Sequence, residues 1–298
     1  MERKGIDLHM HTAVSDGTDS PEELLLRVKE AGIGLFSVTD HDAIKCSRII
    51  PALLQPGDPR FLSGVEFSCR DALGKYHILG YGYDPEAPSI RDLVAYGHGL
   101  RMKKVMARLD FLKTEFGFTF PREEIDDLLA MDNPGKPHIG NLMVRYGYAP
   151  SKDAAIKDYL NRMRFPGEYV RPEEAVRGVL ESGGIPVLAH PAYGDGDQLI
   201  LGEELEERVR RLMDFGLQGM ECFYSGFPSR LRKEMLAMAE RCRLYVTCGS
   251  DYHGSNKLVE LGDTGLAGEG EAPEGLRRFL AAAERRIYPA MDPGGSEI

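Results

Sequence analysis

His9 and His11 stand two residues apart near the start of a chain that has only eight histidines. Side chains at positions i and i+2 of a β-strand lie on the same face, so a strand over residues 6–11 would direct both imidazoles into one pocket. Imidazole nitrogens bind metals and transfer protons near neutral pH. Two solvated polar side chains on a half-exposed strand would give the same spacing, so the pair alone leaves both interpretations open.

Further potential metal ligands lie at or near the ends of the later predicted strands, and one lies in the first loop. Because the carboxyl ends of parallel strands meet at one edge of a sheet, these side chains are expected to lie together. A single histidine at a strand end is more often a satisfied hydrogen-bonding group, but the repetition over successive strands favours a metal site. The nine predicted ligands are His9, His11, Asp16, His41, Glu66, His77, His190, Asp251 and His253.

The types of these ligands indicate the chemistry of the site. Imidazoles and carboxylates without cysteine are typical of catalytic Zn, Mn or Fe. A catalytic zinc ion uses about three protein ligands and keeps one position open, so nine ligands exceed what one ion needs. We therefore expect two or three divalent ions that share a bridging carboxylate. His98 is left out, because it lies between two glycines in a predicted helical segment and follows no strand.

The elements that would position these side chains alternate between apolar runs and amphipathic stretches over residues 1–90 and 166–290. This alternation is typical of βα units and a mostly parallel sheet. Ser20, Pro21 and Glu23 have the types and spacing of a helix N-terminus. Residues 91–165 are charged and amphipathic without a clear strand, which predicts a helical insertion domain, and residues 291–298 are predicted to be a disordered tail.

Composition argues against several classes of protein. The chain has 298 residues, 42% hydrophobic content and a formal net charge of −10, which disfavours an extended nucleic-acid-binding surface. Its five cysteines form no C-x-x-C pair, so a disulfide framework is not expected and a reducing cytoplasm is favoured. No apolar run approaches the length of about eighteen residues that a membrane span needs, so no membrane partner is expected.

Six segments resemble, in this order, the polymerase and histidinol phosphatase (PHP) family of metal-dependent phosphoesterases: DLHMHTAVSDGT, VTDHD, GVEFS, HILGY, VLAHP and GSDYHG. The resemblance covers most of the chain. Residues 133–160 resemble the helical insertion of the subgroup that acts on nucleotides, which includes nucleoside 3′,5′-bisphosphate phosphatases and a 5′-to-3′ exoribonuclease. The resemblance implies an α/β fold, a distorted (β/α)7 TIM-like barrel with a helical insertion, and a trinuclear metal site.

The family pattern also distributes the nine ligands over three ions. It implies one ion held by His9, His11, Glu66 and Asp251, a second by Glu66, His77 and His190, and a third by Asp16, His41 and His253. Lys136 stands where the subgroup usually has arginine. A lysine supplies a positive charge but not the bidentate fork of a guanidinium group, so phosphate recognition is expected to differ here.

The activity implied is hydrolysis of a phosphate ester, with a hydroxide activated by the metals attacking phosphorus. Asp251 and His138 are the predicted catalytic residues, and Lys136 and His138 are predicted to contact the substrate phosphate or the leaving group. Without the resemblance, Lys136 and His138 would be interpreted as a helix N-terminus. Other polar residues near these motifs are equally explained by loop capping or solvation: Asp7, Asp40, Asp42, Arg145, Arg164 and Arg171.

The predicted substrate is a small phosphorylated nucleotide, either a nucleoside monophosphate or a 3′,5′-bisphosphate, hydrolysed as a monoester. The alternative is a phosphodiesterase that opens a cyclic sugar or nucleoside phosphate, or an oligonucleotide, and then hydrolyses the resulting monoester. A non-catalytic metal-binding module would be indicated by missing ligands, but all nine positions are filled. The insertion makes a histidinol phosphatase less favoured.

Overall fold

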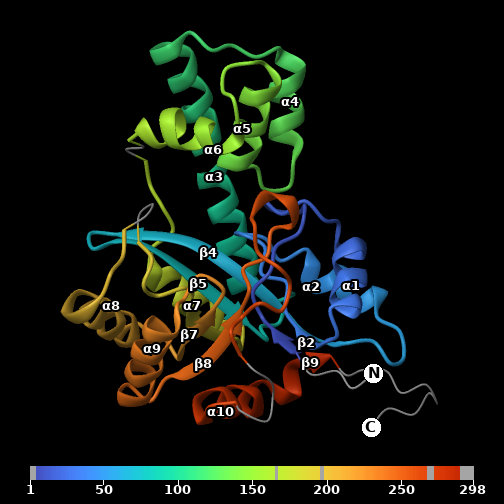
Figure 1. Cartoon of the computed structure of the whole chain (residues 1–298), viewed down its shortest axis with the longest axis vertical. Coiled ribbons are helices and arrows are strands. Elements are labelled where there is room, and N and C mark those ends of the chain that lie inside the picture. The colour runs from blue at the N-terminus through green and yellow to red at the C-terminus, as the bar shows by residue number, and fades with distance from the viewer. Residues whose placement is uncertain (1–4, 165–166, 195–197, 267–271, 289–298) are drawn as a thin grey trace.

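The computed structural model describes residues 5–164, 167–194, 198–266 and 272–288. Its strands form two sheets, helices pack outside the sheets, and a further group of helices stands at one end of the molecule (Figure 1). The predicted mixed α/β class is therefore confirmed. The predicted tail at residues 291–298 lies outside the described residues.

The first sheet has the strand order β1-β2-β3-β9. Its first three strands are parallel, and β9 pairs antiparallel with β3. The strands are β1 (Gly5–Asp7), β2 (Ile33–Phe36), β3 (Arg60–Leu62) and β9 (Ile287–Tyr288).

The second sheet has the order β4-β5-β6-β7-β8 and is only partly parallel. Both pairings of β5 are antiparallel, whereas β6, β7 and β8 run parallel. The expected mostly parallel sheet is wrong at β5, because only two residues separate β4 from β5 and so short a connection joins antiparallel strands. The strands are β4 (Gly64–Asp71), β5 (Gly74–Tyr81), β6 (Ile185–Leu188), β7 (Gly219–Tyr224) and β8 (Tyr245–Gly249).

The two sheets approach each other at the ends of their strands. The amide of Leu8 donates to the carbonyl of Cys248 at 2.9 Å, and isolated parallel bridges join Met10 to Tyr252 and His41 to Glu66. Over the residues that the structure describes, these contacts do not merge the strands into one closed sheet. A closed seven-stranded barrel is thus not confirmed.

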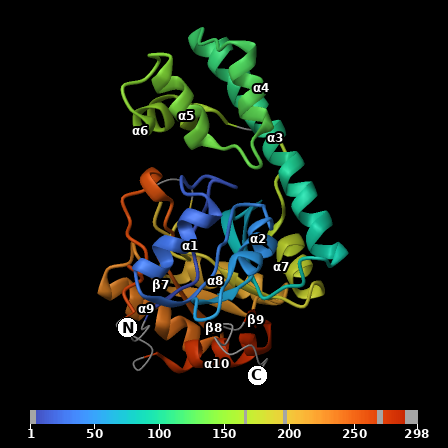
Figure 2. The same cartoon turned by 90° about the vertical axis from the view of Figure 1, so that its right-hand side faces the viewer.

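Five of the longer helices pack against the strands, and a sixth packs against one of these helices. Helix α1 packs on β2, α2 on β3, α7 on β4 to β6, α9 on β7 and α10 on β8, while α8 lies against α7. In both views these helices lie on the outer side of the sheets (Figure 2). They are α1 (Pro21–Glu30), α2 (Cys46–Leu53), α7 (Pro172–Glu181), α8 (Gly202–Asp214), α9 (Ser229–Arg241) and α10 (Glu274–Ala283).

Every described element between residues 88 and 164 is helical. Helix α3 runs from the sheets into a separate group of helices, which has an apolar cluster of its own around Val105, Leu112 and Ile139 (Figure 2). The elements are α3 (Pro88–Phe116), α4 (Arg122–Ala130), α5 (Lys136–Arg145), α6 (Lys152–Ala154), a π-helical turn (Ala155–Tyr159) and a 3₁₀ turn (Leu160–Arg162). The predicted helical character is confirmed, while the division into domains stays a prediction.

The helices form where the sequence supplies caps and an apolar face. In α1 the predicted N-terminus is confirmed: Glu23 donates its amide to Ser20 Oγ at 3.2 Å, and Ser20 donates its amide to Glu23 Oε2 at 2.8 Å. Leu24 and Val28 of this helix are fully buried. Among the described helices, none has the length and apolar composition required to cross a membrane.

Replacing Ser20 with alanine should lower the free energy of unfolding by about 1 kcal/mol, because the Glu23 amide loses its acceptor. Chemical denaturation followed by circular dichroism measures the change. Ser20→Asp retains a side-chain acceptor and serves as the control. Equal losses in the two variants would contradict the capping role.

Candidate metal centre

His9 and His11 lie just beyond β1, which ends at Asp7 rather than extending to residue 11. The predicted strand is too long, because Met10 makes only an isolated bridge to Tyr252. Both imidazoles are nevertheless fully buried, and their ring centroids lie 5.3 Å apart. The two rings share one pocket even though regular strand geometry ends before them.

Glu66 lies at the centre of this pocket, as the third residue of β4 and only 1% exposed. Its Oε1 atom is 2.8 Å from His77 Nδ1 and 3.2 Å from His190 Nε2. Its Oε2 atom is 3.3 Å from His9 Nε2, 3.2 Å from His11 Nε2 and 3.2 Å from His41 Nδ1. One carboxylate therefore contacts five imidazoles that come from four segments of the chain.

Asp251 and Asp16 complete the cluster. Asp251 Oδ1 lies 3.5 Å from His9 Nε2 and 3.3 Å from His11 Nε2. Asp16 Oδ1 lies 3.3 Å from His253 Nε2, and its Oδ2 lies 3.9 Å from His41 Nε2. All nine predicted ligands thus lie in one connected group of side chains.

The charges within the cluster favour ionised carboxylates. Burial alone would raise the pKa of Glu66, but the imidazoles of His41, His77 and His9 outweigh it and hold this pKa well below its usual range. Burial would lower the pKa of His11, yet Asp251 and Glu66 raise it to about 9. Burial dominates at His41 and lowers its pKa to about 3, so this imidazole is neutral and able to act as a metal ligand.

Three buried atoms of the cluster make no hydrogen bond within the described part of the chain: His9 Nε2, His11 Nε2 and Glu66 Oε2. Buried polar atoms normally have a partner, and a divalent cation would serve all three. Imidazole and carboxylate donors are also the ligands that Zn, Mn and Fe accept. The residues present therefore fit divalent metal ions.

Three subsets of the cluster have ligand atoms within 4.8 Å of one another. They agree in part with the distribution that the family pattern implies. They differ in that His190 falls outside them, Glu66 is absent from the His9 subset, and His11 and His41 each belong to two. The subsets are His9, His11 and Asp251; His41, Glu66 and His77; and His11, Asp16, His41 and His253.

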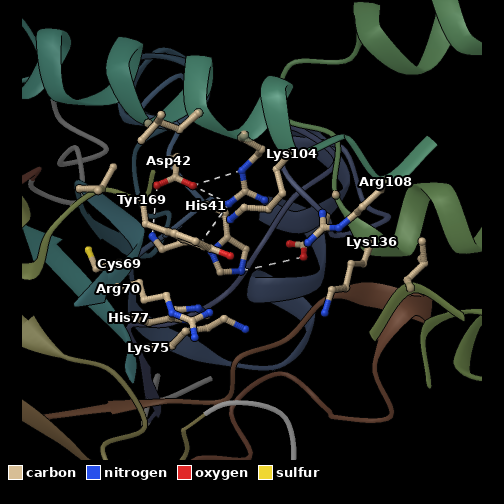
Figure 3. Close-up of a pocket in the computed structure, with 18 of the residues that line it drawn as sticks. His41, Asp42, Cys69, Arg70, Lys75, His77, Lys104, Arg108, Lys136 and Tyr169 are labelled. Carbon is tan, nitrogen blue, oxygen red and sulfur yellow. Dashed lines mark hydrogen bonds and ion pairs between the residues drawn. The ribbon is translucent and has the colours of Figure 1, made fainter. Parts of the chain in front are cut away.

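A cavity of about 840 Å³ opens beside Asp16, His41 and His77, between the sheets and the helices of residues 88–164 (Figure 3). Seven of the residues that line it are lysines or arginines, whereas only Asp16 and Asp42 carry carboxylates. In Figure 3, Lys104, Arg108 and Lys136 lie around the same hollow as His41. A strongly basic cavity thus adjoins the ligand cluster.

Three of these cations lie on one side of α3 at the spacing i, i+3 and i+7: Arg101, Lys104 and Arg108. Arg101 Nε donates to Asp42 Oδ2 at 3.1 Å, and Lys104 Nζ lies 3.8 Å from the ring centroid of Tyr169. Burial, together with Arg108 and Arg101, lowers the pKa of Lys104 to about 7. Burial, with Arg101, also lowers the pKa of Arg108 to about 10, so the surroundings of both side chains disfavour their positive charge.

Lys136 and His138, the predicted substrate contacts, lie at the start of α5 but line two different cavities. Lys136 lines the basic cavity, and its Nζ donates to Asn161 Oδ1 at 2.6 Å. His138 lines a smaller hollow of about 330 Å³ beside α4, and its Nδ1 accepts the Gly135 amide at 3.0 Å. A catalytic role for His138 stays a prediction, since the structure gives this residue a capping role.

The remaining polar residues considered from the sequence fall into two groups. Asp40 accepts from the Thr12 amide and from Ser15 Oγ, and Asp42 pairs with Arg101, so both support residues of the site. Arg164 lines the basic cavity. Arg145 instead pairs with Glu124 on α4, and Arg171 caps α7 through its backbone.

Several residues of the site were not predicted. Glu221 is fully buried within β7 and contacts His9, and Lys257 pairs with Asp251. A carboxylate inside the apolar run GMECFY is an unusual feature that could have drawn attention to Glu221. The cations of α3 share one face, but nothing in the sequence indicates that this face is turned toward the sheets.

Curated relatives with named activities match most of the chain, whereas no protein-family model matches it. A phosphoribosyl 1,2-cyclic phosphate 1,2-diphosphodiesterase from Eggerthella lenta is 30% identical over 83% of this chain and 94% of its own length. The 5′-3′ exoribonuclease Rnm of Salmonella typhimurium is 28% identical over 86% of this chain and 87% of its own. A 3′,5′-nucleoside bisphosphate phosphatase from Chromobacterium violaceum is 29% identical over 83% and 87%.

Among solved structures, a Bifidobacterium adolescentis protein assigned as a metal-dependent phosphoesterase superposes with a TM-score of 0.76 at 27% identity, over 94% of this chain and 96% of that one. Fold, ligand cluster and relatives together define a metal-dependent phosphoesterase, that is, a hydrolase of phosphoric esters. The chain belongs to the PHP family of these enzymes, as its six motifs predict.

Replacing Glu66 with glutamine should remove at least one equivalent of bound metal, because an amide is a far weaker ligand than a carboxylate that faces five imidazoles. Elemental analysis after reconstitution with Mn²⁺ measures the metal content. Asp71→Asn is a matched control on the same strand, since the Asp71 carboxylate pairs with Arg211 outside the cluster. Full metal content in Glu66→Gln would contradict the central place of Glu66.

Proposed function

We propose that the enzyme hydrolyses a phosphate monoester of a small nucleotide that carries a second phosphate, such as a nucleoside 3′,5′-bisphosphate. The observation that carries this proposal is the basic cavity beside the ligand cluster. A cavity of about 840 Å³ has room for a nucleotide, and its seven lysines and arginines favour a ligand with more than one negative charge. A 29% identical relative is named as a bisphosphate phosphatase, which agrees with this choice.

We propose that the nine clustered residues hold two or three divalent ions, with Mn, Fe and Zn all compatible with their donor atoms. When bound, such ions lower the pKa of a coordinated water and offset charge on the phosphoryl oxygens. One oxygen of Glu66 faces His77 and His190, and the other faces His9, His11 and His41. This carboxylate would therefore be suited to join two ions. Asp251 contributes Oδ1 to the cluster, while Tyr224 and Lys257 hold its Oδ2.

The rest of the substrate would lie against the chain's own cations. Lys136 lines the cavity, where Asn161 accepts a hydrogen bond from its ammonium group, and it would meet the phosphate that is cleaved. Arg101 is fixed by Asp42, whose carboxylate also accepts the Ser68 amide at 3.1 Å. Lys104 and Arg108 lie further along α3 and would meet the second phosphate.

The second candidate is a phosphodiesterase that opens a cyclic phosphate or an oligonucleotide before hydrolysing the monoester. Two relatives favour it, because one is named as a cyclic phosphate diphosphodiesterase and another as an exoribonuclease. The same basic cavity would accept a monoester or a diester substrate. The two candidate functions are therefore distinguished by the products that each substrate yields.

For the whole molecule we propose that residues 1–90 and 166–290 form a PHP domain whose two sheets are a distorted, opened (β/α)7 barrel. The bridges Met10–Tyr252 and His41–Glu66 support this view, since they join the strand ends of the two sheets. Residues 91–165 would be an insertion domain, supported by their separate apolar cluster. All five cysteines are free, which suits a cytoplasmic location.

A panel of substrates tests the proposed function. With the Mn²⁺-reconstituted enzyme, adenosine 3′,5′-bisphosphate should release inorganic phosphate with a higher kcat/KM than AMP, because the second phosphate meets the basic cavity. Bis-p-nitrophenyl phosphate and a cyclic ribose phosphate provide the diester comparison, and His9→Ala and Asp251→Asn control for contaminating activity. Turnover of the diesters alone would overturn the monoesterase proposal in favour of the second candidate.

Removing a cation from α3 tests the place of the second phosphate. Lys104→Met should lower kcat/KM for adenosine 3′,5′-bisphosphate about 10-fold to 100-fold more than for p-nitrophenyl phosphate, because one charge-assisted contact is lost. Lys103→Met is the matched control, since Lys103 is an exposed lysine on the same helix outside the cavity. An equal loss for both substrates in Lys104→Met would contradict this placement.

A further inference from the structure

Strand β7 ends in no predicted metal ligand, although it lies between β6 and β8, which precede His190 and Asp251. It instead contains Glu221, a carboxylate with no exposed surface. A buried carboxylate is costly unless its oxygens accept hydrogen bonds. The partners of Glu221 therefore indicate why it is present.

Both oxygens of Glu221 are used, and both contacts reach predicted ligands. Oε1 lies 3.0 Å from His9 Nδ1, and Oε2 accepts the backbone amide of His190 at 2.8 Å. A hydrogen on His9 Nδ1 directed at Glu221 would leave Nε2, which faces the cluster, available to a metal ion. That atom lies 3.3 Å from Glu66 Oε2 and makes no hydrogen bond among the described residues.

Tyr224, three residues further along β7, acts on Asp251 in a similar way. Its hydroxyl donates to Asp251 Oδ2 at 2.9 Å, which leaves Oδ1 facing His9 and His11. No contact of Glu221 or Tyr224 with Asp16, His41 or His253 is found in the described part of the chain. Among the described residues, the direct contacts of Glu221 and Tyr224 with predicted ligands are therefore those to His9, His190 and Asp251.

The backbone conformation near Glu221 and Tyr224 is unusual at the residues that they contact. His190 and Asp251 have positive φ angles of 26° and 58°, which non-glycine residues rarely adopt unless surrounding contacts hold them. Gly249 lies beside the pair, where an added Cβ would be 2.1 Å from His9 Cβ and 2.6 Å from Glu221 Oε1. Only glycine leaves room for the His9–Glu221 contact at this position of β8.

We propose that β7 is a positioning strand, in which Glu221 fixes the ring of His9 and the backbone of His190 while Tyr224 fixes Asp251. Neither residue is a ligand or touches the substrate. They serve the ions held by His9, Asp251 and His190, and not the ion held by the Asp16, His41 and His253 group. This inference rests on the proposed function, because it presupposes that the cluster binds metals.

Metal binding by the full-length protein tests the proposal without relying on activity. Wild type and Glu221→Gln are stripped with a chelator, titrated with Mn²⁺ against a competing chelator, and analysed for bound metal. Glutamine keeps the size of the side chain but cannot offer two acceptor oxygens. The expected result is a 10-fold to 100-fold weaker affinity for one or two equivalents, with the remaining equivalent bound as in wild type.

Asp7→Asn is the matched control, because Asp7 is also fully buried but, among the described residues, accepts the backbone amides of His9, Ser250 and Gly262 and contacts no ligand side chain. It should lower the melting temperature without the selective loss of metal. Equal metal losses in Asp7→Asn and Glu221→Gln would overturn the proposal, since general destabilisation would then explain both. Wild-type affinity and stoichiometry in Glu221→Gln would overturn it as well.

Tyr224→Phe provides a second, milder variant that decides the matter if Glu221→Gln does not fold. Losing one hydroxyl should weaken binding of the same equivalents by a smaller factor, and unchanged binding would then overturn the proposal. A wild-type protein that binds no Mn²⁺, Fe²⁺ or Zn²⁺ would instead overturn the proposed function, and the positioning role with it. The two failures are therefore distinguishable.

Discussion

The structure depends on one buried carboxylate. Glu66 is removed from water, yet five imidazoles from β5 and three loops surround its two oxygens. In a low-dielectric interior the charge of this carboxylate persists only while those neighbours, or cations that they share with it, remain close. The sheets, the bridge between His41 and Glu66 and the turns that follow the strands all serve to keep these groups within about 3 Å of Glu66.

The cluster could be predicted from the sequence because its members belong to short motifs at strand ends. Spacing places His9 and His11 on one side of the chain, and a run of ligand-bearing motifs in a fixed order leaves few alternatives. The sequence did not indicate the course of β5. A connection of two residues forces β4 and β5 to run antiparallel, so His77 reaches Glu66 from across a hairpin rather than from the end of a parallel strand.

Residues that act through other residues were harder to find. Glu221 lies in a strand that otherwise appears entirely apolar, and its partners His190 and His9 lie 31 and 212 residues away in the sequence. Arg101, Lys104 and Arg108 carry a recognisable helical spacing, but the direction of α3 depends on its packing against α7. Contacts between residues far apart in the sequence, and the direction in which a helix face points, are set by the tertiary structure. The local sequence pattern does not predict them.

The predicted metal ligands and most of the cations that line the basic cavity come from different parts of the chain. The predicted metal ligands come from the sheets and their loops. Of the seven cations that line the cavity, Arg70 and Lys75 come from β4 and β5, whereas the other five come from the helical segment between β5 and β6. A change in the length or tilt of α3 would move the anion-binding side chains relative to a fixed reaction centre. Sequence changes in these helices could therefore alter which phosphorylated molecule binds, while the predicted metal ligands stay unchanged.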